Sequence, residues 1–193
     1  MALSSDIAML IAEIEANQSH AESIAHGLSR EQFNWHPEPG RWSIAQCISH
    51  LNLCVGMDLT PLKEAIARGR AEGKTGEGPF TYGMLAKKFV ASMEPSPTTR
   101  KVSAPKVYIP PPEAEPGAAL AEYKRIGGEL RRIAESADGL HLGKVKAKMP
   151  ALPPVLRPFL RMALGARFLL ITTHDRRHLM QAEAVRNHAE FPT

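Results

Sequence analysis

The chain has 193 residues, of which 44% are hydrophobic and 23% are charged, values that are ordinary for a soluble globular protein. This length fits one domain that buries its core without help from disulfides or a structural metal, so we expect any bound metal to serve the function. The net charge of +4 hides an asymmetry, because residues 1–120 carry 11 Lys and Arg against 13 Asp and Glu, whereas residues 121–193 carry 13 against 7.

The basic residues come singly or in pairs, as on solvated helix faces, and no interleaved aromatic motif accompanies them. No apolar run approaches the roughly 20 residues of a membrane span. The N-terminus also lacks the basic region and the apolar block of a secretory signal. We therefore expect a cytoplasmic protein that binds neither nucleic acid nor membranes.

The first predicted helix covers about residues 4–28. Apolar residues recur there at helical spacing, and glutamates occupy the other side. The apolar set is Ile7, Leu10, Ile11, Ile14, Ala21, Ile24, Ala25 and Leu28. Residues 34–40 are too rich in Pro and Gly to continue a helix, so they predict a connecting loop.

A second helix is predicted to begin at Ser43, because Ser43 and Gln46 have the spacing of a capping box. It runs to about residues 67–70, and Pro61 either starts a new helical turn or kinks it. His50 lies two turns in, beside the apolar stripe, where an imidazole reaches the interior of a bundle.

The two cysteines, Cys47 and Cys54, lie seven residues apart on this helix, which separates them by about 10.5 Å along the axis. A disulfide needs Cα atoms within about 7 Å, so both are expected to be reduced, as in the cytosol. Each is either a core residue or a soft extra metal ligand near His50.

The remaining elements complete an all-α chain. A short helix is predicted at residues 82–93, and the Pro-rich residues 95–116 predict a long crossover that links helices running in parallel. A third long helix covers residues 117–136, residues 142–158 are short extended or irregular structure, and a final helix runs from Phe159 or Met162 to Arg186. Residues 1–193 are therefore expected to form a single four-helix-bundle domain.

His174 and His178 are four residues apart in the final helix, so their imidazoles point from one face and can grip one metal ion. His50 is the best third ligand. Three histidines leave coordination positions open, as a catalytic site requires. The competing interpretation is that these are hydrogen-bonded core histidines. The other five have no such spacing and are expected in surface or loop positions, with His20 closest to a buried face: His20, His26, His36, His141 and His188.

The Trp42-Ser43 start of the second helix, followed by His50, and the late His174-x-x-x-His178-x-x-Gln181 pattern resemble the DinB-like (DinB/YfiT) superfamily of metal-binding four-helix bundles. The resemblance covers nearly the whole chain. It implies that His50, His174 and His178 bind one divalent metal, commonly zinc, nickel or iron. Gln181 matches a family glutamine, which implies that it either orients a bound water or substrate or plays a structural part.

Members of this superfamily include transferases that use low-molecular-weight thiols such as bacillithiol, and a mycothiol-dependent maleylpyruvate isomerase. The resemblance thus implies a metal-dependent enzyme acting on a small molecule, such as a thiol S-transferase or a related isomerase or hydrolase. The alternative is a non-catalytic stress-response protein that binds a metal or ligand. We also expect a homodimer, with the Pro-rich segments either covering the site or forming the dimer surface.

Three arginines could pair with the carboxylates of a thiol cofactor: Arg167, Arg176 and Arg177. Helical angle places the last two away from the histidine face, which favours solvent exposure. A metalloprotease is disfavoured, because that motif needs glutamate where this chain has Asp175. Asp175 is expected to be either an exposed helix carboxylate or an acceptor that orients a ligating imidazole.

Overall fold

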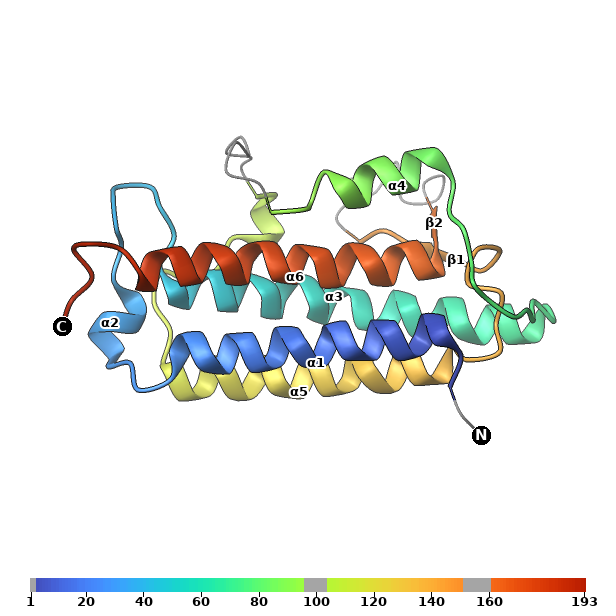
Figure 1. Ribbon diagram of the computed structural model, residues 1–193, viewed down its shortest axis with the longest axis horizontal. Helices are drawn as coiled ribbons and strands as arrows, with labels where there is room; N and C mark the ends of the chain where they lie inside the picture. The colour runs from blue at the N-terminus through green and yellow to red at the C-terminus, as the bar shows by residue number, and fades with distance from the viewer. Residues whose placement is uncertain (1–2, 96–103, 151–160) are drawn as a thin grey trace.

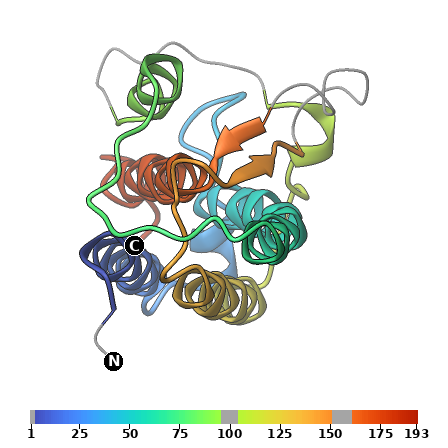
Figure 2. The same cartoon turned by 90° about the vertical axis from the view of Figure 1, so that its right-hand side faces the viewer.

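The computed structural model describes residues 3–95, 104–150 and 161–193. Its four long helices are α1 (Ser5–Ala25), α3 (Ile44–Ala71), α5 (Pro116–Ser136) and α6 (Leu164–Arg186). They pack side by side, with α3 and α6 each contacting α1 or α5 as well as each other. Seen end-on, the four helices occupy the corners of a square (Figure 2). The expected all-α architecture is confirmed.

The crossover connects parallel helices, as expected. Helices α3 and α5 run in one direction and α1 and α6 in the other (Figure 1). The chain therefore has to return along the molecule between the end of α3 and the start of α5. This return contains α4 (Met84–Ala91) and the 3-10 turn η1 (Lys106–Tyr108). Helix α4 packs on α6 on the outside of the four long helices (Figure 1).

The start of α3 agrees with the capping-box prediction. The Ser43 hydroxyl accepts from the backbone N–H of Gln46, and the Gln46 side chain accepts from the backbone N–H of Ser43. The helix then continues through Pro61 to Ala71. These bonds fix where the helix begins, and hence which face carries His50.

Three boundaries differ from the sequence predictions. Helix α1 ends at Ala25, because Gly27 takes the left-handed conformation, with φ of 73°, that ends helices. Residues 30–34 form a short helix, α2 (Arg30–Asn34), in front of the expected loop. The final helix begins at Leu164, because β2 (Arg161–Ala163) pairs antiparallel with β1 (Lys146–Lys148). The expected start at Phe159 lies outside the described residues.

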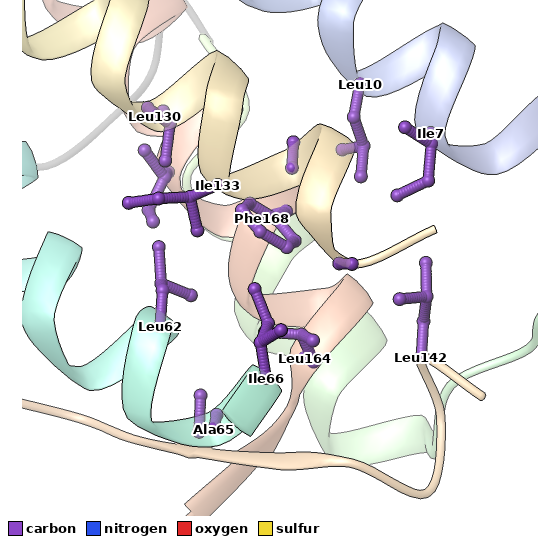
Figure 3. Close-up of a cluster of buried hydrophobic side chains, with 14 of the residues drawn as sticks. Ile7, Leu10, Leu62, Ala65, Ile66, Leu130, Ile133, Leu142, Leu164 and Phe168 are labelled. Atoms are coloured by element: carbon purple, nitrogen blue, oxygen red, sulfur yellow. The ribbon is translucent and has the colours of Figure 1, made fainter. Parts of the chain in front are cut away.

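The core consists of two main apolar clusters arranged along the bundle. Figure 3 shows the larger one, in which Leu62, Leu130 and Phe168 meet from three different helices. The second cluster lies toward the other end and includes Ile48, Tyr123 and Leu179. On α6 the two histidines lie between Ile171 of the first cluster and Leu179 of the second, and on α3 His50 lies at the end of the second cluster, shortly before Val55 of the first. The candidate site therefore lies at the junction of the two clusters.

No helix in the described ranges is both long and apolar enough to span a bilayer.

Candidate metal centre

The structure brings together the three histidines that the sequence singled out. One ring nitrogen from each of His50, His174 and His178 lies within 4.8 Å of the others. The ring centroid of His50 lies 5.2 Å from that of His174 and 4.6 Å from that of His178. The ring centroids of His174 and His178 are 4.6 Å apart. Helices α3 and α6 thus present three nitrogen donors to one point, and the cluster could hold a metal ion.

The three histidines of the cluster differ in exposure. His50 is buried, with 4% of its surface exposed, whereas His174 and His178 are half-buried. Burial lowers the pKa of all three imidazoles. Charge repulsion from His50 lowers the pKa of His174 and His178 further, and repulsion from His178 also lowers that of His174. Burial, together with repulsion from His50, brings the pKa of His178 to about 3. All three rings are therefore neutral at pH 7, which is the state that binds metals.

Hydrogen bonds from Nδ1, here called the outer ring nitrogen because its partner lies outside the cluster, fix two of the imidazoles. His50 Nδ1 lies 2.7 Å from the Tyr108 carbonyl oxygen, and because a carbonyl only accepts, Nδ1 carries the proton. His178 Nδ1 likewise donates to Gln181 Oε1 at 3.1 Å. In both rings Nε2 is left unprotonated and available to a metal. Orientation of ligating histidines by such acceptors is a general feature of metal sites.

Gln181 contacts one of the candidate ligands. Its amide oxygen accepts from the His178 ring, one helical turn away on α6. Gln181 therefore lies where it can orient the His178 ring, and its role in the site stays a prediction.

Trp42 covers the cluster from the start of α3. Its ring lies 4.8 Å from that of His50 and stacks on His178 at 5.6 Å, with an angle of 30° between the planes. Helical periodicity alone does not single out Trp42, which the sequence marks only as part of a family pattern. Its position immediately before the N-cap of α3 was the signal that could have placed it beside His50.

The two cysteines have different surroundings. Cys47 is fully buried in the second apolar cluster, which confirms that it is a core residue. Cys54 is half-buried, and its sulfur lies 3.5 Å from Nε2 of His50. Both thiols are free, as predicted.

The expectation of an exposed Asp175 is wrong. Asp175 is buried because its side chain points toward α5, where Oδ2 accepts from the Tyr123 hydroxyl at 3.1 Å. Burial raises the pKa of this carboxyl to about 8, against the opposing effect of the Tyr123 hydrogen bond. Its other oxygen, Oδ1, has no protein partner among the described residues.

The arginines are engaged with protein groups. Arg167 forms a buried ion pair with Asp58. This pair lies about two helical turns from the histidines along the contact between α3 and α6. Arg176 pairs with Glu13 at 3.0 Å and with Glu94 at 2.7 Å, and Arg177 donates to the Ser92 carbonyl oxygen. The last two are half-buried rather than solvated, because the end of α4 lies against them. In the described structure, these contacts occupy the guanidinium groups that were candidates for substrate carboxylates.

The remaining histidines stay outside the cluster, as expected. His20 lies 3.5 Å from Glu183, and His36 bonds the Arg41 carbonyl oxygen. His188 accepts from the Glu190 backbone N–H, and the His141 ring lies against Phe80. His26 follows the last residue of α1.

The fold and the cluster define a helical protein with a candidate three-histidine metal centre. The sequence matches the family model of the DinB superfamily over residues 13–182, which is most of the chain. The chain therefore belongs to the DinB superfamily. Neither the curated proteins nor the solved structures with which it was compared include a match.

Proposed function

We propose that the protein binds one divalent metal ion, zinc, nickel or iron, through His50, His174 and His178. The observation that carries this proposal is the convergence of three neutral imidazole nitrogens within 4.8 Å. Nitrogen donors of this kind suit zinc, nickel and iron. Two of the rings are held by acceptors on their outer nitrogens, which reduces the cost of ordering them when a metal binds.

We further propose that the metal serves a reaction on a small molecule, with a thiol S-transferase as the leading class. A metal held by three imidazoles lowers the pKa of a thiol or water that joins it. The protein residues prepare this chemistry by orienting the donors and by shielding one side of the centre with Trp42. His174 and His178 are only half-buried, so a small molecule would reach the centre past these two residues.

The second candidate is a non-catalytic protein that binds a metal or ligand. The position of Cys54 favours this candidate, because a fourth protein donor near His50 would close the shell that a catalytic site keeps open.

The two functions are separated by an assay of thiol consumption. Bacillithiol, cysteine or coenzyme A is mixed with monobromobimane, and the rate is measured with metal-loaded protein, metal-free protein and a His178→Ala variant. His188→Ala is the matched control, since this histidine lies outside the cluster. An S-transferase consumes thiol faster than background only in the loaded parent and the control. Equal background rates in all samples, with the metal bound, would support the non-catalytic candidate.

A further inference from the structure

Cys54 lies one helical turn after His50, on the same face of α3. Its sulfur is 3.5 Å from Nε2 of His50 and 3.8 Å from Nδ1, so it faces the inner nitrogen of the ring more closely than the outer one. The outer nitrogen is already bonded to the Tyr108 carbonyl oxygen. The thiol therefore lies beside the nitrogen that is available for a metal.

This separation is the one expected for two donors of a single tetrahedral ion. Zinc binds imidazole nitrogen at about 2.0–2.1 Å and thiolate sulfur at about 2.3 Å, which places nitrogen and sulfur about 3.6 Å apart across a tetrahedral angle. The observed 3.5 Å between Cys54 Sγ and His50 Nε2 needs little adjustment of this pair. The sulfur is not among the donor atoms that lie within 4.8 Å of one another, so a turn of the Cys54 side chain has to bring it toward His174 and His178 when the metal binds.

Packing does not explain Cys54 as it explains Cys47. Cys47 is completely buried among apolar side chains of the second cluster. Cys54 is half-buried and belongs to none of the three apolar clusters formed by the described residues. It stands instead in a polar row on α3, between His50 and Asp58, at successive intervals of four residues.

We propose that Cys54 donates its sulfur to the metal ion held by His50, His174 and His178, giving a centre of three nitrogens and one sulfur. This inference rests on the metal binding proposed above. The thiol loses its proton to solvent as the sulfur–metal bond forms, and no oxidant or reductant is needed. Without a metal, burial and the neighbouring carboxyls of Asp175 and Asp58 raise the pKa of the thiol, so it stays protonated.

A sulfur donor changes what the centre selects and how it reacts. Thiolate together with imidazole favours softer ions such as zinc over magnesium or manganese. A small-molecule thiol would then have to share the ion with Cys54 or displace it. Cys54 would thereby set how easily the centre admits an external ligand.

Cobalt(II) is the probe that tests this proposal, because sulfur bound to cobalt gives a near-ultraviolet charge-transfer band that nitrogen donors do not give. Metal-free parent protein, Cys54→Ser, Cys54→Ala and Cys47→Ala are each titrated with cobalt(II). Bound cobalt is measured in the same samples by elemental analysis, and folding is followed by circular dichroism. Cys47→Ala is the control, since it removes the other thiol of the same helix.

The proposal predicts about one cobalt per chain in the parent, with the band present in the parent and in Cys47→Ala. Both Cys54 variants should keep bound cobalt through the histidines but lose the band. One bound cobalt without the band in the parent, or a band that persists in the Cys54 variants, would overturn the sulfur donor and leave the three-histidine centre intact. A parent that binds no cobalt, zinc, nickel or iron would overturn the metal centre and, with it, the role of Cys54.

Discussion

Gln181 shows how a single contact can tune the candidate centre. Its amide oxygen accepts from His178 Nδ1 and so leaves Nε2 to the metal. We expect Gln181→Ala to weaken metal binding by about 10- to 100-fold, the usual effect of removing an acceptor behind a ligating histidine. Isothermal titration with zinc measures this change. Gln181→Glu, which keeps an acceptor, should bind nearly as tightly as the parent, and equal affinity in Gln181→Ala would contradict the role.

The buried pair of Asp58 and Arg167 makes a second prediction for individual residues. Both side chains are almost completely buried, so each charge depends on the other. We expect Asp58→Asn to lower the free energy of unfolding by about 3–5 kcal/mol, because it leaves the guanidinium buried without a counter-charge. Urea unfolding of the metal-free protein measures the loss.

The double variant Asp58→Leu with Arg167→Met is the control for this pair. Replacing both charges by apolar groups removes the unpaired charge, so this variant should recover much of the stability. A loss below about 0.5 kcal/mol in Asp58→Asn would show that water reaches the pair.

At the scale of elements, the N-cap of α3 positions the candidate ligand His50. Ser43 is fully buried and its hydroxyl accepts from the Gln46 backbone N–H. We expect Ser43→Ala to lower the free energy of unfolding by about 0.5–2 kcal/mol. Thermal and urea unfolding measure the effect, and Ser43→Asp, which retains an acceptor, is the matched variant. Unchanged stability in Ser43→Ala would mean that α3 does not depend on this cap.

The sequence predicted those elements that have local signals. The Ser43 capping box predicted the start of α3, and the same Ser-x-x-Gln spacing at Ser29 and Gln32 was available for α2 but was overlooked, because five residues are too few to show helical periodicity. The pairing of β1 with β2 joins residues 146–148 to 161–163, and no local pattern indicates such a partner. This pairing is why the start of α6 was placed too early.

The same holds for the candidate site, where only the residues with a local sequence signal could be predicted. Helical spacing predicted the face shared by His174 and His178, and the position of His50 in a buried stripe predicted the third member. The acceptor for His50 is a backbone carbonyl in η1, 58 residues away, and a carbonyl has no side-chain signal. Asp175 was misplaced because helical angle does not show which neighbouring helix covers a given side.

At the scale of the whole molecule, the candidate site places titratable groups between two apolar clusters. In metal-free protein, burial lowers the pKa of His50, His174 and His178 below the ordinary value of about 6.5. The unfolded chain then binds more protons than the folded protein below that pH. The stabilising contribution is therefore complete above pH 6.5 and is lost as the pH falls toward the folded pKa values.

We accordingly expect the metal-free protein to lose stability between pH 7 and pH 5, by up to about 1.4 kcal/mol per pH unit for each of the three histidines. Asp175 and Asp58 act in the opposite sense, because burial raises the pKa of both carboxyls and makes the folded state bind extra protons, but two carboxyls do not offset three imidazoles. Urea unfolding in the presence of a chelator measures the slope. His178→Gln should show a shallower slope, and a parent that gains stability over this range would contradict the assignment.

Two expectations about the whole molecule stay predictions: the homodimer and the cytoplasmic location. Light scattering on the purified protein measures the first directly.

The binding of one metal ion by three histidines from two helices is checked by elemental analysis of protein purified without chelators or metal-binding tags. His50→Ala is analysed beside the parent, and His188→Ala is the control outside the cluster. We expect about one zinc, nickel or iron per chain in the parent and the control, and loss of that metal in His50→Ala. A parent that contains no metal after reconstitution, or a His50→Ala variant that retains it in full, would show that the histidines do not bind a metal.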